Sequence, residues 1–224
     1  MKSATIKTKK LIIRALEDEE LKKRRYEQTD IQRQKAYADM LAGCNADPKN
    51  RLWYTAWEVT LKGSGEFVGD VCFKGEPKDD EAEITCFLSD KFKDSAEAAD
   101  AVDELAEWGF SNSNDLYFVS VWVDAQSDAL ANTLDDGDFS AVEENESVVK
   151  FERVRAEMAW LPIGMCLGVS LGSSFGLLFD NLALGIGLGL SMGVALGLLV
   201  DAGNKKKRTE ILRKHNREYS EDEE

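Results

Sequence analysis

Hydrophobic and polar residues follow one another along this chain in three different patterns. From residue 1 to about 158, short apolar runs are separated by charged stretches, as in a domain that folds in water. Residues 160–201 are almost entirely apolar, and residues 202–224 are again charged, running from KKKR to EDEE. We therefore expect a globular domain over residues 1–158, an apolar block over residues 159–201 and a charged tail over residues 202–224.

Local periodicity in the first 158 residues predicts a succession of strands and helices. Apolar alternation and short apolar runs predict strands at 9–15, 52–60, 66–74, 81–88 and 116–123, and a hairpin of 139–145 with 147–154. Helical spacing predicts helices at 17–25, 31–44, 95–110 and 127–135. The strongest of them is 95–110, whose apolar face carries Ala98, Val102, Leu105 and Trp108. This mixture indicates an α/β (α+β) domain.

The apolar block contains two uncharged runs of 19 residues, 161–179 and 182–200. A helix of that length spans about 28 Å, which is close to the roughly 30 Å hydrocarbon core of a bilayer. Only Asp180 and Asn181 separate the two runs. The block therefore predicts a transmembrane helical hairpin that turns at this polar pair.

Glycine recurs at every fourth position in both runs, and the second run is a recognisable copy of the first. Each glycine inside a helix costs about 1 kcal/mol relative to alanine, so a repeated pattern needs a compensating close contact between helices. We interpret these glycines as helix-packing positions of a membrane anchor. Assembly of several copies around a pore and a hairpin buried in a soluble core remain alternatives. The glycines are Gly164, Gly168, Gly172, Gly176, Gly185, Gly189, Gly193 and Gly197.

Basic residues flank the apolar block on both sides. Lys150, Arg153 and Arg155 precede it, and the run 205–208 follows it. Basic flanks favour the cytoplasmic side of a membrane, so we expect membrane lipid as a partner and both termini in the cytoplasm. The first ten residues, MKSATIKTKK, lack the apolar stretch of a cleavable signal peptide.

The composition excludes several classes of function. The net charge of -14 argues against a nucleic-acid partner, which would require a basic surface. His215 is the only histidine, which excludes Ser/His/Asp and Cys/His catalysis and a histidine-rich metal site, and we expect no metal. The four cysteines show no CxxC spacing and are expected to be reduced thiols: Cys44, Cys72, Cys86 and Cys166.

Five segments over residues 5–154 carry a family resemblance by their order and spacing. They are KKLIIRAL, GEFVGDVCFKG, EAEITCFL, AEWGF and YFVSVWVDA. In this order the chain resembles the GNAT N-acetyltransferase superfamily, and most of all its ribosomal-protein alanine acetyltransferase branch. The resemblance implies a mixed, mostly antiparallel sheet flanked by helices, with acetyl-CoA as the cofactor. The apolar hairpin lies outside the family pattern.

The resemblance also places the cofactor site, at the loop between the family's fourth strand and its long helix. Its pattern there is [Q/R]-x-x-G-x-[G/A], and glycine lets backbone N–H groups face the pyrophosphate. Lys93 keeps the basic position, but Asp94 replaces the glycine, and with Glu97 it predicts a capping box for the helix. The implied cofactor-binding positions are Cys86, Phe87, Leu88, Lys93, Asp94, Ser95, Ala96, Glu97 and Ala98.

Several features around this loop speak against acetyl-CoA. Residues 90–149 contain 16 acidic residues against two lysines, an unfavourable field for a polyanion. Ser127 stands where the family has asparagine, Asp138 replaces a family glycine, and residues 130–134 lack the tyrosine that many members use as general acid. Glu83 on the fourth strand is the one candidate general base, acting through water, unless it is merely a solvated strand residue.

Three hypotheses follow for the function. The first is a membrane-tethered, GNAT-like protein with weak or lost acetyl-CoA-dependent activity and a binding or scaffolding role toward a protein partner still to be identified. The second is an active membrane-associated N-acetyltransferase that uses acetyl-CoA to modify a protein N-terminus or a small amine. The third is a homo-oligomeric membrane protein assembled through the glycine stripes, with the GNAT-like domain as its regulator.

Overall fold

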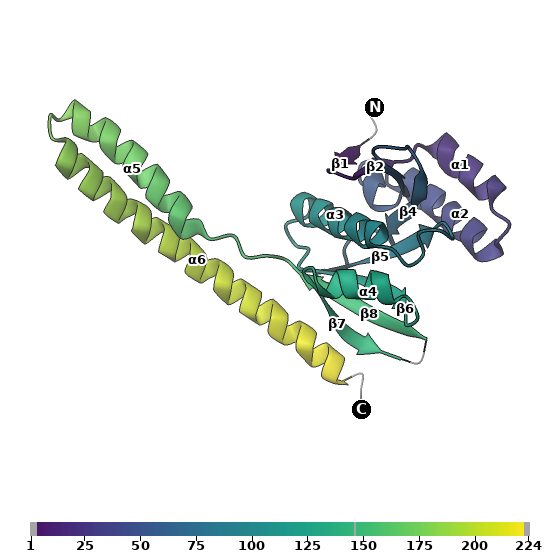
Figure 1. Cartoon of the computed structure of the whole chain (residues 1–224). Coiled ribbons are helices and arrows are strands. Elements are labelled where there is room, and N and C mark those ends of the chain that lie inside the picture. The colour runs from purple at the N-terminus through teal and green to yellow at the C-terminus, as the bar shows by residue number, and fades with distance from the viewer. Residues whose placement is uncertain (1–3, 146, 222–224) are drawn as a thin grey trace. The chain divides into compact units, whose positions relative to one another are not determined.

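A computed structural model describes residues 4–145 and 147–221, with the side chains of residues 218–221 left out. The chain divides into two compact units, Met1–Arg155 and Ala156–Glu224, which we describe separately (Figure 1). The expected acidic end of the tail, residues 222–224, lies outside the described residues, as do residues 1–3.

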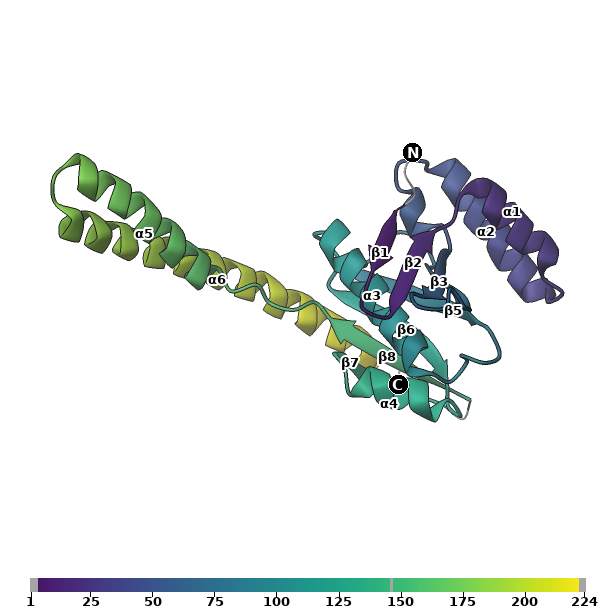
Figure 2. The ribbon, with the colours of Figure 1, turned by 45° about the horizontal axis from the view of Figure 1, so that its top comes forward.

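The first unit is built on a single eight-stranded sheet with the order β1-β2-β3-β4-β5-β6-β8-β7 (Figure 2). Neighbouring strands pair antiparallel except for the parallel pair β5–β6. This arrangement confirms the mixed, mostly antiparallel sheet expected from the sequence. The strands are β1 (Thr5–Lys7), β2 (Leu11–Ala15), β3 (Trp57–Leu61), β4 (Phe67–Phe73), β5 (Glu81–Leu88), β6 (Phe118–Asp124), β7 (Phe139–Glu144) and β8 (Val148–Val154).

Helices cover both faces of the sheet. On one face α3 buries its apolar stripe against alternate strand residues such as Val71 and Phe73. The intervening residue Cys72 belongs to a second cluster under α1 and α2, because successive strand residues point to opposite faces. The helices of this unit are α1 (Asp18–Glu27), α2 (Ile31–Ala46), the 3-10 turn η1 (Arg51–Trp53), α3 (Ala96–Asn112) and α4 (Asp128–Asp135).

One predicted strand was placed wrongly, and one strand was missed. The strand expected at 52–60 begins only at Trp57, and the residues before it include η1. The physical reason is aromatic packing, because the Trp53 ring lies 4.6 Å from that of Phe73 and 5.0 Å from that of Trp108. The short edge strand β1 was not predicted from the sequence. Three residues are too few for the alternation of a strand to be recognised in the sequence. The strand forms because it pairs with β2.

The parallel strands β5 and β6 pair over only part of their length. Residues Glu81 to Ile84 of β5 pair with Phe118 to Val121 of β6. Beyond this point β5 continues to Leu88 and β6 to Asp124 without pairing to each other. From these two unpaired strand ends the chain continues into α3 and α4 respectively. The candidate site lies at this end of the two strands.

The second unit consists of the antiparallel helices α5 (Trp160–Leu178) and α6 (Leu182–Glu221). The predicted turn at Asp180 and Asn181 is present: Asp180 has a positive φ of 52°. Asn181 donates its backbone N–H to Gly176 O at 2.8 Å, and its side chain accepts the N–H of Leu184 at 3.1 Å. One polar pair thus closes α5 and begins α6.

Helix α6 does not end where the apolar run ends at Val200. It continues through the charged residues to Glu221, and at 1.5 Å per residue its 40 residues extend about 60 Å. By length and composition, the segments Trp160–Leu178 and Leu182–Arg217 could each cross a membrane. Large apolar side chains such as Leu167, Phe175 and Met192 are mostly exposed in this unit.

Candidate cofactor site and glycine hairpin

In the loop between β5 and α3, two side chains accept backbone N–H groups at the starts of helices. The predicted capping box of Asp94 with Glu97 is wrong, because Ser95 caps α3 and its Oγ accepts the N–H of Ala98 at 3.2 Å. Asp94 instead accepts the backbone N–H of Leu130, in the first turn of α4, at 2.8 Å. Its carboxylate therefore connects the start of α4 to the loop that precedes α3.

This geometry matters for phosphate binding. A phosphate at a helix N-terminus is held by backbone N–H groups that have no partner inside the helix. Here Ser95 satisfies one such group of α3, and Asp94 satisfies one of α4 and brings a negative charge to it. A pyrophosphate at this loop would have to displace or repel that carboxylate.

The two lysines of the acidic stretch are both in ion pairs. Lys93 Nζ lies 2.6 Å from Asp90 Oδ1, and Lys91 Nζ lies 2.5 Å from Glu66 Oε1. The hydrogen bond from Lys93 lowers the pKa of Asp90. Since all four side chains are exposed, these pairs add little stability, but they leave the basic position of the loop already neutralised.

The remaining positions implied for the cofactor divide between the two faces of β5. Cys86 packs against the core under α3, and burial raises the pKa of its thiol to about 12, so it is not a thiolate nucleophile at neutral pH. Leu88 and Ala98 are buried in the same core. Phe87 packs on the other side, with its ring 5.6 Å from that of Tyr37. Ala96 and Glu97 lie in the first turn of α3.

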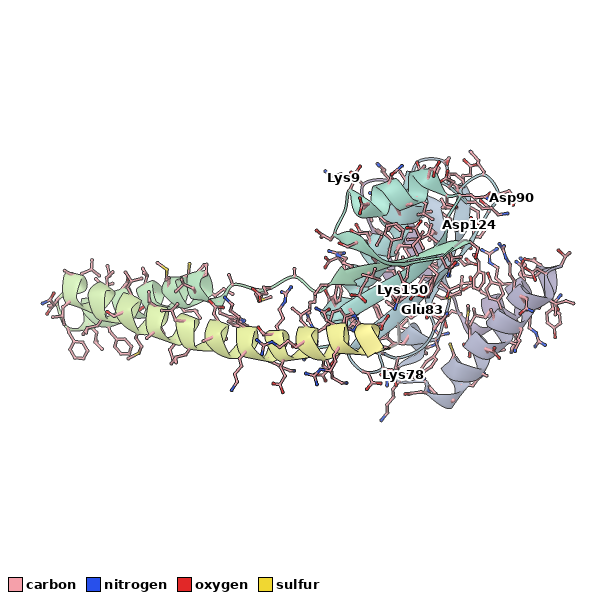
Figure 3. The ribbon with its side chains drawn as sticks, turned by 90° about the horizontal axis from the view of Figure 1, so that it is seen from below. Lys9, Lys78, Glu83, Asp90, Asp124 and Lys150 are labelled. Carbon is pink, nitrogen blue, oxygen red and sulfur yellow. The ribbon has the colours of Figure 1, made fainter. Side chains whose placement is uncertain are left out.

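Glu83, the candidate general base, lies on β5 within the segment that pairs with β6 (Figure 3). Its carboxylate forms an ion pair with Lys74, and its side chain is only partly exposed. Two residues earlier, Glu81 accepts a hydrogen bond from Ser120 Oγ at 2.6 Å and lies 3.0 Å from Lys150 Nζ. Polar groups of β5, β6 and β8 thus form a row that sequence reasoning missed, because only strand pairing brings them together.

A second feature missed from the sequence is Asp70 on β4, which is 1% exposed. Tyr37 Oη donates to Asp70 Oδ2 at 2.6 Å, and Arg24 Nε lies 3.3 Å from the same oxygen. The other oxygen, Oδ1, has no hydrogen-bond partner among the described residues. Burial raises the pKa of Asp70 from 3.8 to about 6, against the opposing effect of Arg24. The only signal in the sequence is one acid inside the apolar strand FVGDVCF.

In the second unit, the eight glycines of the two stripes lie between α5 and α6. A Cβ atom added at any of them would come within 3.0 Å of the backbone of the opposite helix. The stripes interleave: Gly168 meets Gly189 and Gly193, and Gly172 meets Gly185 and Gly189. A Cβ atom added at Gly187, which is outside the stripes, would meet no other described atom within 4 Å beyond its own stretch of helix. The fourfold spacing thus lets two backbones touch along the length of the hairpin.

Asp201 closes the open end of this hairpin. Its two carboxylate oxygens accept the backbone N–H groups of Trp160 at 2.7 Å and Leu161 at 3.0 Å. A residue of α6 therefore caps the N-terminus of α5, whose own preceding residue Ala159 makes no side-chain cap. One pair of hydrogen bonds holds the two ends of the hairpin together.

Several acetyltransferases are among the solved structures similar to this chain. The ribosomal-protein-S5-alanine acetyltransferase of Vibrio fischeri is 12% identical, with a TM-score of 0.53, over 69% of this chain and 98% of that one. A GNAT-family acetyltransferase of Bacillus anthracis is 14% identical, with a TM-score of 0.47, over 67% of this chain and 98% of that one. An acetyltransferase of Agrobacterium tumefaciens is 17% identical, with a TM-score of 0.48, over 68% and 95%.

At 12% identity the likeness to the Vibrio fischeri structure establishes the fold and no more, and the fold is the one expected from the resemblance in the sequence. The family model described as glycine zipper membrane protein matches residues 158–202, which contain the hairpin stripes. No curated protein matches the chain. The chain thus joins an acetyltransferase-like domain of GNAT fold to a glycine-zipper membrane region.

Proposed function

We propose that this chain, a GNAT-type fold joined to a glycine-zipper hairpin, is a membrane-tethered binding or scaffolding protein with weak or lost acetyltransferase activity. The hairpin is the anchor, and because α5 and α6 are antiparallel, its two ends lie on the same side of the membrane. Basic residues follow the second span, which favours the cytoplasmic side for both termini. The first unit binds a protein partner at that surface.

The position of Asp94 is the observation that carries the proposal. Its carboxylate accepts the Leu130 N–H at the loop where the family's glycine would let backbone groups face a pyrophosphate. Residues 1–155 contain 33 acidic against 21 basic side chains, so the whole unit also repels a polyanion. The nearby carboxylate and the net charge of the unit therefore both disfavour the binding of acetyl-CoA.

Calorimetric titration of the detergent-solubilised chain with acetyl-CoA tests the proposal. We expect no binding at micromolar concentrations for the natural chain and no turnover for either the natural chain or Asp94→Gly. Asp90→Gly is a second variant, because it frees Lys93 from its ion pair and leaves the bond from the Leu130 N–H to Asp94 in place, and we expect no binding by it either. Micromolar binding by the natural chain, or a Michaelis constant that changes in Asp94→Gly, would contradict the loss of activity.

One observation favours a second candidate, an active N-acetyltransferase that takes acetyl-CoA and an amine or a protein N-terminus. The unpaired ends of β5 and β6 beyond Ile84 and Val121 leave the two strands separated, as a cofactor inserted between them would require. Glu83 would then be the general base. In that case Glu83→Gln lowers kcat at least 100-fold with KM for acetyl-CoA unchanged, while a scaffold shows no rate to lose.

The third hypothesis, oligomerisation through the glycine stripes, has less support. All eight stripe glycines face the other helix of the same hairpin, so further copies would have to use other faces. Leakage of dye from liposomes that contain the full chain would support a pore, and intact liposomes would count against it.

A further inference from the structure

The hairpin has a groove to which the proposed anchor role assigns no use. Because α5 and α6 touch at glycine backbone, the larger side chains beside the contact project above it as two walls. They enclose a groove of about 550 Å³. Its walls are Leu167, Leu171 and Phe175 of α5 and Leu188, Met192 and Leu196 of α6. Apart from Asn181 at the turn, every lining residue is apolar or glycine.

The shape of the groove suits a chain-like occupant. Its lining on α6 runs from Leu184 to Val200, a length of about 24 Å at 1.5 Å per residue. The floor is a line of glycines, whose lack of side chains leaves a smooth and narrow channel. An extended hydrocarbon chain has these proportions, and burying it there would remove apolar surface on both sides.

Polar groups lie beyond the end of the groove, on the side of α6 that carries Val200. Since α6 is one unbroken helix at about 100° per residue, Lys207 lies within about 20° of Val200 around the axis and about 10 Å further along it. Asn204 lies within about 40° of the same line, whereas Lys205 lies about 140° away. The carboxylate of Asp201 also lies at this end of the groove. Each of its two oxygens accepts an N–H of α5, and these hydrogen bonds weaken its repulsion of an anion.

We propose that this groove binds one acyl chain of an anionic phospholipid whose phosphate is held by Lys207 and Asn204. The proposal rests on the proposed insertion of the hairpin into a membrane. Charge favours a lipid over a second copy of the chain. Residues 202–217 contain seven basic side chains and one acid, so two copies repel each other at this end while an anionic headgroup is attracted.

Native mass spectrometry of the full chain, extracted into detergent from bilayers of phosphatidylglycerol and phosphatidylcholine, tests the site. We expect one phosphatidylglycerol to be retained per chain. Met192→Trp fills the groove and lowers that occupancy at least tenfold, and Leu167→Trp does so from the opposite wall. Leu190→Trp, outside the groove lining, is the control and keeps the lipid. Lys207→Gln lowers occupancy severalfold, whereas Lys205→Gln, with the same charge change, does not.

Retention that is equal for the two lipids, or unchanged in both tryptophan variants, overturns the proposal. The proposal also fails if Met192→Trp dissociates an oligomer of the chain while the lipid stays bound, because the groove would then be an interface between copies. Extraction of the membranes with carbonate separates this outcome from a failure of the anchor. If the chain resists carbonate and the groove variants keep their lipid, only the lipid site is wrong, and if carbonate releases the chain, the proposed anchor is wrong as well.

Discussion

At the scale of single residues, three aspartates owe their roles to partners that are distant in the chain. Asp94 accepts an N–H of α4, Asp201 accepts two of α5, and Asp70 lies buried beneath α1 and α2. Each is an acid of the same intrinsic chemistry. Backbone N–H groups make the first two into caps. Burial raises the pKa of Asp70, one oxygen of which has no hydrogen-bond partner among the described residues.

Burial makes the charged form of Asp70 unfavourable, and the ion pairs around it do not compensate fully. Arg14 donates to Glu20 at 2.9 Å and to Glu58 at 3.1 Å, and Arg24 donates to Glu58 at 2.5 Å. Two arginines and two glutamates thus balance one another without Asp70. An ionised Asp70 is the surplus charge of this cluster, taken out of water.

Asp70→Asn is therefore expected to change how stability depends on pH. In the natural protein the folded state has the higher pKa for this acid, about 6 against 3.8, so it binds more protons between about pH 4 and pH 6. The free energy of unfolding contributed by Asp70 is present below that window and is lost as the pH rises through it. The variant lacks this loss, which amounts to at most about 3 kcal/mol. Urea unfolding from pH 4 to pH 8, followed by tryptophan fluorescence, measures it. Parallel pH profiles for the two proteins would contradict the prediction.

At the scale of elements, the two glycine stripes act as a matched pair. Each glycine of α5 lies opposite one or two positions of α6 in antiparallel register, so the contact depends on both copies of the repeat. Asn181 at the turn and Asp201 at the open end fix the register from its two ends. The glycine packing and the two caps therefore together determine how α5 pairs with α6.

Two alanine substitutions on α6 are expected to have opposite effects. At Gly189 a methyl group collides with the backbone of α5, so Gly189→Ala destabilises the hairpin by about 1–3 kcal/mol. At Gly187 the space is open, so Gly187→Ala stabilises it by up to about 1 kcal/mol through the better helix propensity of alanine. Reversible unfolding in mixed detergent micelles, followed by circular dichroism, gives both values. Equal effects at the two positions would show that the stripe contact does not hold the hairpin.

At the scale of the whole molecule, the chain separates two kinds of chemistry. The first unit has an apolar cluster on each face of its sheet and a net charge of -12, from 33 acidic and 21 basic residues. The second unit exposes its large apolar side chains and carries its basic residues just beyond them on α6. Residues 1–155 bury their apolar side chains within their own unit, as a domain that folds in water does. The hairpin leaves large apolar side chains exposed, which is favourable only in an apolar solvent such as the interior of a bilayer.

Fractionation of cells that produce the full chain or residues 1–155 alone tests this division. We expect the full chain in the membrane fraction, resistant to carbonate and released by detergent. Residues 1–155 should be folded and soluble, since their buried residues pack against one another. Release of the full chain by carbonate would exclude a spanning hairpin, and sedimentation of residues 1–155 with membranes would place part of the attachment in the first unit.

The sequence alone determined the elements whose signal is local. Alternation located β5 at residues 81–88, helical spacing located α3 to within two residues of each end, and the fourfold glycines with Asp180 and Asn181 defined the hairpin. In each case the pattern is contained within one element, because burial of a strand face or a helix stripe repeats with the period of the backbone.

Only the tertiary structure decided the roles that depend on contacts across the chain. The residue pairs Asp94 with Leu130, Tyr37 with Asp70, and Trp160 with Asp201 are 36, 33 and 41 positions apart. No periodicity links residues at such separations, and local reasoning assigned Asp94 to the wrong helix for that reason. Side-chain caps and buried charges act through space over about 3 Å, so their partners are known only once the chain is folded.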